Sequence, residues 1–304
     1  MKHLFIVNPV AGGQDRTRQI HAMAEAAFRD REDSYEVYVT RGPLNATERI
    51  RSEAASGEQL HVYSCGGDGT FNECVCGAAL LDNVAVAPFP YGTGNDFCRM
   101  FGEEAALYQD FDALLDATEH PIDLIRVNER YSVNICSVGI DARIGTDVHR
   151  YSKLPIVGGA TGYVISSAVN MFKGINRYME VRCGGFESQG SHALVCVCNG
   201  RYYGGGFNPC PEAMPDDGLL DIFVVKRVNL LTFAALIGKY AKGQADRLPK
   251  RLITHLRGTD LEIRFLEENV INVDGEAIYS DTVHMRLLPG ALKLLVPRGM
   301  HFFD

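Results

Sequence analysis

The 304-residue sequence lacks an excess of positive charge, because 30 Lys and Arg residues face 38 Asp and Glu residues and leave a formal net charge of −8. Proteins that wrap nucleic acid through phosphate contacts are normally basic, so no nucleic-acid partner is expected. No apolar run approaches the ~18 residues of a membrane span. The N-terminus, MKHLFIVNP, lacks the cleavage site of a signal peptide. We therefore expect a cytoplasmic protein whose contact with membranes is peripheral.

Several familiar site signatures are missing as well. The nine cysteines contain no C-x-x-C pair and no zinc-finger spacing, which favours reduced thiols in a cytosolic protein. No G-x-x-x-x-G-K-[ST] loop is present, which excludes an ordinary P-loop enzyme, and no G-x-G-x-x-G dinucleotide fingerprint occurs. The H-R-D and D-F-G signatures of protein kinases are also absent. A nucleotide would therefore be held mostly by backbone groups and small donor side chains.

What the sequence contains is an ordinary globular balance, 46% apolar and 22% charged, in a length that favours two domains. In the first third, short apolar strands alternate with helical spacing, which predicts a parallel sheet. The expected strands are 4–7, 35–40, 60–64 and 84–87, and the expected helices are 17–28, 47–55 and 71–81. Glycine clusters at 12–13, 66–69 and 92–94 follow strands, at the edge where such sheets bind ligands.

Near Pro121 the pattern changes to many short strands, which predicts an antiparallel sandwich or barrel. The turn Asn128-Glu129 predicts a hairpin between 122–127 and 131–138. The remaining strands are expected at 179–183, 192–198, 219–225, 261–265, 270–273, 283–287 and 292–296, with one helix over 229–241. We therefore expect an N-terminal α/β domain over 1–122, completed by 291–304, and a C-terminal β-sandwich domain over 123–290.

The loop Gly66-Gly67-Asp68-Gly69-Thr70 joins an expected strand to an expected helix. Glycines let backbone N–H groups approach phosphate oxygens, and the following helix N-terminus adds positive potential. Asp68 cannot bind phosphate directly because like charges repel, so it would act through Mg²⁺ or as a hydrogen-bond acceptor that fixes the loop. A plain turn with Thr70 as helix cap is the alternative.

A second glycine loop, Pro90–Asp96, follows the next strand and should lie beside the first. Thr93 and Asn95 would be its donors and Asp96 its acceptor. Together the two loops could surround a polyphosphate and its metal ion.

A resemblance is carried by Asn8-Pro9 with Gly12-Gly13, by Gly66–Glu73 (GGDGTFNE) and by Gly92–Phe97 (GTGNDF). These motifs resemble the diacylglycerol kinase catalytic-domain family, and within it the soluble bacterial lipid kinases. Later motifs fit in the same order: 139–142 (GIDA), 199–206 (NG with GGG), 211–221 (ending in DDGLLD) and 274–276 (DGE). The match covers roughly residues 4–299, although GGDGT alone is shared with NAD kinases.

The resemblance implies an ATP-dependent lipid kinase with an α/β nucleotide-binding domain of the NAD kinase/diacylglycerol kinase type, a β-sandwich domain for the lipid substrate, and a site in the cleft between them. The family's general base, a Glu in a D-G-E motif, corresponds to Glu276. The family's structural Mg²⁺ corresponds to the carbonyls of Met214 and Leu219 and the carboxylate of Asp217. The implied ATP contacts are Asn8, Thr40, Gly66, Gly67, Asp68, Gly69, Thr70, Phe71, Asn72 and Thr93.

The expected reaction is transfer of the γ-phosphate of MgATP to a lipid hydroxyl, with diacylglycerol as the leading acceptor and phosphatidic acid as the product. A sphingoid base or phosphatidylglycerol is the alternative acceptor, and an NAD kinase is a more distant alternative. A catalytically silent nucleotide- or lipid-binding regulator is the alternative from another class. Asp68, Asp217 and Glu276 argue against such a regulator, because this sequence has all three acidic residues that match the family's site.

Two segments bear on membrane contact. Residues 239–257 hold six Lys and Arg and one Asp, which indicates either a solvated helix-and-loop face or a patch for anionic lipid headgroups. The apolar, glycine-containing segment Lys153–Lys173 would line a lipid entrance or pack in the core. A free β-edge could pair in a homodimer.

Overall fold

The computed structural model describes residues 1–140, 142–143 and 174–304. Asp141 of the GIDA motif and the segment Lys153–Lys173 lie outside the described residues. The chain divides into two compact units, Met1–Leu124 with Leu288–Asp304 (unit 1) and Ile125–Leu287 (unit 2). Among the described helices, none is long and apolar enough to cross a membrane.

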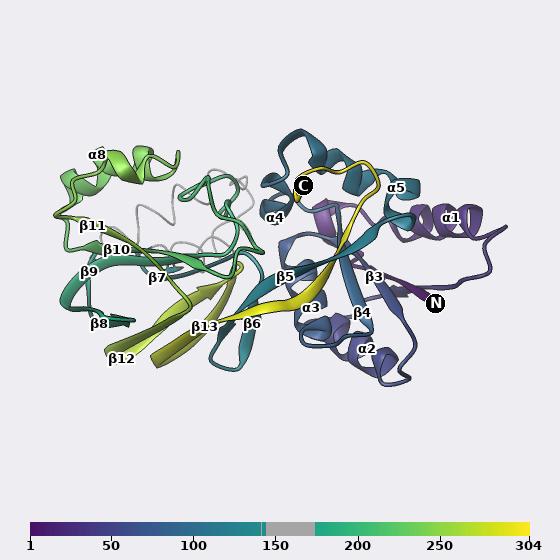
Figure 1. Ribbon diagram of the computed structural model, residues 1–304, viewed down its shortest axis with the longest axis horizontal. Helices are drawn as coiled ribbons and strands as arrows, with labels where there is room; N and C mark the ends of the chain where they lie inside the picture. The colour runs from purple at the N-terminus through teal and green to yellow at the C-terminus, as the bar shows by residue number, and fades with distance from the viewer. Residues whose placement is uncertain (141, 144–173) are drawn as a thin grey trace. The chain divides into compact units, whose positions relative to one another are not determined.

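Unit 1 is built on a parallel sheet in the order β2–β1–β3–β4, and the end of β13 adds a fifth strand beside β4 (Figure 1). Its strands are β1 (Lys2–Val7), β2 (Ser34–Val39), β3 (Leu60–Gly66), β4 (Val84–Pro90) and the end of β13 (Glu276–Val296). Every residue of β3 and β4 is buried. Continuous apolar runs are typical of such parallel strands, because both faces of the sheet are covered.

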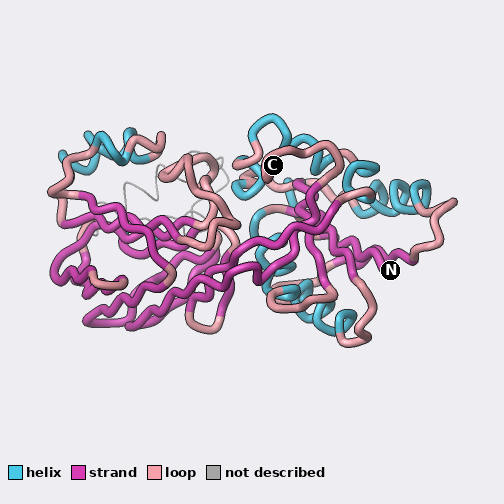
Figure 2. The backbone as a smooth tube through the Cα atoms, viewed as in Figure 1, coloured by secondary structure: helices cyan, strands magenta, loops and turns pink. Residues whose placement is uncertain are grey.

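Helices lie on both sides of this sheet (Figure 2). They are α1 (Thr17–Ala27), α2 (Asn45–Ala54), α3 (Asp68–Ala78), α4 (Asp96–Arg99) and α5 (Phe111–Leu115), with 3₁₀ turns η1 (Ala11–Gly13) and η2 (Gly102–Gln109). The predicted amphipathic spacing holds in α1, where Ile20 and Ala24 are buried. The α/β part of the predicted fold is therefore confirmed.

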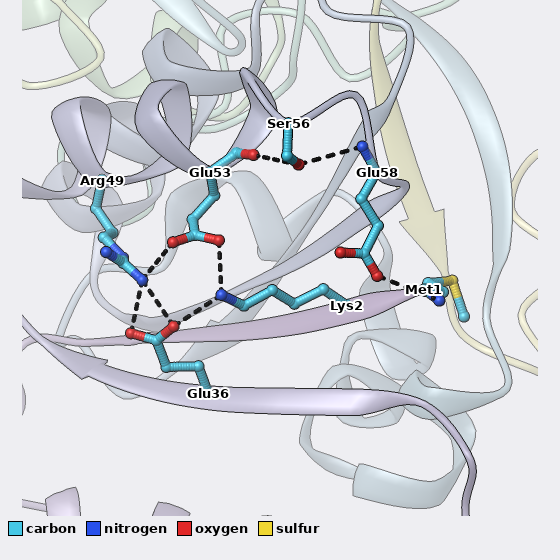
Figure 3. A network of polar contacts seen from close by, with 7 residues as sticks. All are labelled: Met1, Lys2, Glu36, Arg49, Glu53, Ser56 and Glu58. Atoms are coloured by element: carbon cyan, nitrogen blue, oxygen red, sulfur yellow. Dashed lines mark hydrogen bonds and ion pairs between the residues drawn. The ribbon is translucent and has the colours of Figure 1, made fainter.

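A polar network joins β1, β2 and α2 at the surface of unit 1 (Figure 3). The ammonium of Lys2 donates to Glu36 at 2.9 Å and to Glu53 at 2.6 Å. The guanidinium of Arg49 also contacts both carboxylates. Because each cation is shared by two anions, the network orients α2 on the strands more firmly than an isolated exposed pair would.

Unit 2 is a largely antiparallel β structure with strands in the order β11–β10–β9–β7–β12–β13. The sandwich core lies between strand faces that contribute residues such as Val195, Val197, Ile263 and Ile271. The opposite face of β9 packs beneath α8, so both faces of this strand are buried over residues 192–198. The strands are β5 (Thr118–Val127), β6 (Arg130–Ser132), β7 (Ile135–Gly139), β8 (Arg177–Cys183), β9 (Phe186–Cys198), β10 (Leu220–Lys226), β11 (Ile253–Gly258), β12 (Asp260–Val273) and the start of β13, with α8 (Leu230–Tyr240) and η3 (Ala245–Arg247).

Several predicted elements beyond residue 125 were wrong in detail. The strands expected at 261–265 and 270–273 are one strand, β12. The expected strand 131–138 is divided into β6 and β7, because the N–H groups between them bind the carboxylate of Asp274. The basic segment 239–257 is not only helix and loop, since β11 is part of the sheet. The strands expected at 283–287 and 292–296 are one strand, β13, which passes Gly290 in a left-handed conformation.

Candidate functional site

The two glycine loops of unit 1 are in direct contact. The N–H groups of Tyr91 and Gly92 both donate to the carbonyl of Gly66, at 2.8 and 3.1 Å. A Cβ atom on Gly92 would lie 2.4 Å from the Cα of Gly67. Real Cβ atoms do not approach backbone atoms this closely, so the two loops can lie this close only with glycine at position 92.

Asp68 anchors the second loop to the first. Its carboxylate accepts the N–H of Asp96 at 2.6 Å, at the start of α4. Burial raises the pKa of Asp68 above its ordinary value, although the N–H groups of Asp96, Asn95 and Phe97 act in the opposite direction. Of the two roles considered for Asp68, the geometry therefore matches the acceptor that fixes a loop.

Asn8 and Thr40 lie at the carboxyl ends of the neighbouring strands β1 and β2, and Asn8 contacts the first glycine loop. Asn8 follows β1, and its Nδ2 donates to Thr70 Oγ1 at 3.0 Å. Thr40 follows β2, and its N–H donates to the carbonyl of Val7 at 2.9 Å. The structure thus brings Asn8 and Thr70 together at the edge of the sheet where α/β folds bind ligands.

Other predicted nucleotide contacts have side chains that point into the unit. Phe71 is 4% exposed and packs against the ring of Phe97 at a centroid distance of 4.9 Å. Asn72 is 5% exposed, and its Oδ1 lies 3.7 Å from the thiol of Cys76. Both could meet a ligand only through their backbone, as could Gly69 within α3. Thr93 is exposed in the second loop.

A cavity of about 460 Å³ lies beside the second loop, and its one basic lining residue, Arg16, was not predicted. The guanidinium of Arg16 stands 4.6 Å above the ring of Tyr91. Its buried Nε has no hydrogen-bond partner among the described residues. The residue is partly exposed, and its Nη1 donates to Gln19 Oε1 at 3.3 Å. A cationic side chain with one unsatisfied donor next to two glycine loops is suited to an anionic ligand. No spacing in the sequence distinguished this arginine from others.

In unit 2 the D-G-E motif forms a tight hairpin turn. Asp274 and Gly275 have φ values of 49° and 95°, as a type I′ turn requires, and Glu276 pairs with Val273. Asp274 accepts hydrogen bonds from Ser132 Oγ at 2.6 Å and from the N–H groups of residues 133–135 at 2.8–3.1 Å. Asp274 therefore holds the turn, while Glu276 is exposed.

The N-G motif is linked to this turn by Asn134, a residue that the sequence analysis did not single out. The N–H groups of Asn199 and Gly200 both donate to the carbonyl of Asn134 at 2.9 Å. The N–H of Asn134 itself donates to Asp274 at 3.1 Å. Asn134 carried no signal in the sequence, because it lies within what reads as a continuous strand.

The segment matched to the Mg²⁺ site offers oxygen donors, but its carboxylate already has a cationic partner. Asp217 Oδ1 accepts the N–H of Leu219 at 3.0 Å, and Oδ2 accepts a hydrogen bond from Arg257. The side-chain sulfur of Met214 lies 3.0 Å from a guanidinium nitrogen of Arg201. Two carbonyls and a carboxylate fit a hard cation in kind, and an ion at Asp217 would take the place of Arg257.

Two family models match nearly the whole chain. The diacylglycerol kinase catalytic domain matches residues 2–127, and the YegS C-terminal NAD kinase beta sandwich-like domain matches residues 134–296. A protein of Pseudomonas aeruginosa PAO1 named "Probable lipid kinase YegS-like" is 30% identical over 98% of this chain and 95% of its own length. The chain belongs to the YegS-like family. A YegS relative from Salmonella newport is 32% identical over 78% of each chain.

A solved structure supports the fold of this YegS-like chain. A "putative diacylglycerol kinase" of Bacillus anthracis Sterne has 27% identity and a TM-score of 0.76, and the match covers 99% of this chain and 98% of that one. The α/β catalytic domain and the β-sandwich-like domain are thus shared with solved relatives.

Proposed function

We propose that this YegS-like protein is an ATP-dependent lipid kinase. Membership of a family whose relatives are named probable lipid kinases supports this reaction class. The observation that carries the proposal most is the contact between the two glycine loops, which Asp68 fastens and which only glycines permit. Such loops present backbone N–H groups to phosphate oxygens.

In the proposed mechanism, unit 1 binds the triphosphate of ATP. The N–H groups of residues 66–70 and the hydroxyls of Thr70 and Thr93 would hold the phosphates, and Arg16 would add a cation beside the second loop. Holding the phosphates in place supplies much of the catalysis in phosphoryl transfer, since little covalent chemistry is left to the protein.

Glu276 is the proposed general base. Its carboxylate would accept the proton of the lipid hydroxyl while that oxygen attacks the γ-phosphorus and the bond to the β-phosphate oxygen breaks. The type I′ turn held by Asp274 gives Glu276 a fixed position on a strand end. Such a base is usually worth about 10²–10⁴ in rate.

Mg²⁺ is the proposed metal, held by Asp217 and by the carbonyls of Met214 and Leu219. Bound there, the ion would fasten the D-D-G-L segment and add positive charge. Asp217 would exchange its contact with Arg257 for the ion, so the segment would remain neutralised in both states.

Diacylglycerol is the proposed acceptor, and phosphatidic acid the product. An apolar pocket discriminates weakly between similar chains, so a sphingoid base or phosphatidylglycerol remains the second candidate. NAD is disfavoured as acceptor because the N-terminal part of the chain matches the diacylglycerol kinase catalytic domain and because its relatives are named probable lipid kinases.

We propose that the protein is cytosolic and meets its substrate at the membrane surface through unit 2. On α8, Leu230 and Leu231 are 44% and 82% exposed. The basic residues that follow are exposed as well: Lys239, Lys242, Arg247, Lys250 and Arg251. Exposed leucines at the start of α8, followed along the chain by lysines and arginines, suit an interface of anionic lipid. A homodimer through an edge strand such as β2 stays a prediction.

The test of this function is phosphate transfer from γ-labelled ATP to lipid in mixed micelles. A labelled lipid supports the kinase and identifies its acceptor. Label in NADP alone would assign the chain to the other reaction, and no label in any acceptor would favour the silent regulator.

A further inference from the structure

Three residues with metal-ligating side chains meet in unit 2, and two of them, Cys210 and Asp221, stand at the two ends of the segment that holds the D-D-G-L motif. They come from different elements: Cys210 from the loop before β10, Asp221 from β10 and His255 from β11. One sulfur, one carboxylate oxygen and one imidazole nitrogen all lie within 4.8 Å of one another. Within the described part of the chain, this group alone has three such atoms in reach of one ion.

The sheet register explains why these side chains meet. Asp221 on β10 lies opposite Cys198 on β9 and Arg257 on β11. His255 lies two residues from Arg257 and therefore projects from the same face of the sheet. Its ring is stacked on Phe223 with centroids 4.4 Å apart, which fixes the imidazole plane. His255 Nε2 lies 2.6 Å from Asp221 Oδ1.

The three side chains differ in burial, and burial also acts on the cysteine thiol. Cys210 and Asp221 are each 5% exposed, whereas the His255 side chain is 46% exposed and opens the group to solvent. Burial raises the pKa of the Cys210 thiol to about 12, with Asp221 adding to the effect. The N–H groups of Glu212 and Ala213 bind Cys210 and oppose this shift, because they favour the thiolate. The thiol is therefore protonated when no ion is bound, and a bound cation would lower its pKa and displace the proton.

We propose that Cys210, Asp221 and His255 bind a Zn²⁺ ion. A thiolate, a carboxylate and a neutral imidazole carry two negative charges, which balance the ion, and they are the ligand types that zinc takes. Water from the exposed side of His255 would complete the four ligands. Mg²⁺ does not suit this set, since it requires oxygen ligands in octahedral geometry.

The surroundings resemble the second layer of a metal site. Arg257 Nε lies 3.5 Å from Asp221 Oδ1, and its other end contacts Asp217, so its charge is already shared. Ligands of a tetrahedral zinc site stand roughly 3.3 Å apart. Binding would therefore replace the contact between His255 and Asp221 and separate the two by less than about 1 Å. Partly exposed His255 has room to move by this amount.

The ion would link Cys210 to Asp221 and so tie together the two ends of a segment that contains the whole D-D-G-L motif. A metal that binds only the folded state stabilises it. The consequence is a zinc-dependent melting temperature that does not require ATP, Mg²⁺ or lipid. Zinc binding would thus be measurable whether or not the protein has the proposed kinase activity.

The test uses the full chain, freed of metal by chelator and dialysis, and titrated with Co²⁺ and Zn²⁺. Wild-type protein should bind one equivalent of Co²⁺ with the strong thiolate charge-transfer and tetrahedral visible bands, and Zn²⁺ should displace it. Cys210→Ser should lose the thiolate band. His255→Gln, at an exposed position that the fold tolerates, should weaken Zn²⁺ binding about 10-fold or more.

Two matched controls remove a thiol and an imidazole elsewhere in unit 2. Cys183→Ser and His284→Gln should bind Co²⁺ as the wild type does. An absent cobalt spectrum in the wild type would overturn the proposal. Equal Zn²⁺ affinity in wild type, Cys210→Ser and His255→Gln would also overturn it, since the binding would then be adventitious. A large excess of Mg²⁺ should leave the spectrum unchanged, and its loss in Mg²⁺ would contradict the thiolate site.

Discussion

Asp68 Oδ1 accepts the N–H of Asp96 at 2.6 Å, which ties the first glycine loop of unit 1 to the second. The acidic residue within GGDGT is therefore part of the loop's construction. A Cβ on Gly94 would lie 2.6 Å from the other oxygen of Asp68, so the second loop closes over this carboxylate with no room for a larger residue. The proposed phosphate site depends on this junction.

Gly92→Ala tests the junction directly. Its new methyl group would lie 2.4 Å from the Cα of Gly67, so the loops must separate. We expect a loss of roughly 1–3 kcal/mol in the free energy of unfolding, as for other overpacked sites, and weaker ATP binding measured by calorimetry. Gly42→Ala is the control, because a Cβ there meets nothing within 4 Å. Unchanged ATP affinity in Gly92→Ala would show that the contact between the loops is not needed for nucleotide binding.

The parallel strands and glycine loops of unit 1 were predictable from sequence because they depend on local pattern. Strand β3 is rich in β-forming residues and is fully buried, and its end is marked by glycines, so the position of Asp68 followed from the chain order. The partner of Asp68 could not be derived in the same way. Its contact with Asp96 depends on how two loops pack in space.

Long-range contacts account for the errors in unit 2. Residues 131–138 have strand propensity throughout, yet the carboxylate of Asp274, about 140 positions later, takes the N–H groups of Val133 and Asn134 and ends β6. The cluster of Cys210, Asp221 and His255 was missed for the same reason. Its spacing of 11 and 34 residues matches no metal motif, and only the register of β10 with β11 brings Asp221 and His255 together.

Asp217→Ala should abolish the response of unit 2 to Mg²⁺. With wild-type protein we expect added Mg²⁺ to raise the melting temperature, because the ion binds the folded state alone. Without the Asp217 carboxylate this shift should disappear. Asp260→Asn removes another exposed carboxylate of unit 2 and should keep the wild-type shift. A Mg²⁺-dependent shift of unchanged size in Asp217→Ala would remove Asp217 from the proposed metal ligands.

His3 makes the stability of unit 1 depend on pH. Burial lowers the pKa of His3 to about 4, and the neighbouring His61 adds to the effect. In the unfolded chain His3 binds a proton near pH 6.5, whereas in the folded chain it stays neutral down to about pH 4. The contribution of neutral His3 to the free energy of unfolding is therefore complete above pH 6.5 and is lost as the pH falls toward 4. The loss should be roughly 1–3 kcal/mol.

Urea titrations at pH 7.5 and pH 5 measure this difference. His3→Phe keeps a ring against Tyr63 and Phe28 and cannot titrate, so its stability should change less between the two pH values. His21→Gln removes an exposed histidine and should behave as the wild type. A pH dependence of His3→Phe equal to that of the wild type would assign the acid sensitivity to other groups.

The basic residues at the end of α8 and in the turn before β11 should determine binding to anionic vesicles. Replacing Lys239, Lys250 and Arg251 by Gln removes three charges worth about 1 kcal/mol each near such a surface. The constant for partition of the protein onto vesicles, measured by co-sedimentation, should then fall by roughly 100-fold. The control triple variant changes exposed arginines elsewhere, at Arg29, Arg130 and Arg227. Equal losses in the two triple variants would mean that net charge, and not this surface, directs the protein to lipid.

The most direct measurement is transfer of label from γ-labelled ATP, with Mg²⁺, to micelles that contain diacylglycerol, phosphatidylglycerol or sphingosine, with NAD in a parallel reaction. Wild type, Glu276→Gln and the control Glu129→Gln, which changes the exposed tip of another hairpin, would be compared side by side, together with their ATP affinities. We expect labelled phosphatidic acid from the wild type and from Glu129→Gln, and at least about a 100-fold loss in Glu276→Gln with ATP affinity retained. No labelled lipid from the wild type, or full turnover by Glu276→Gln, would contradict the account.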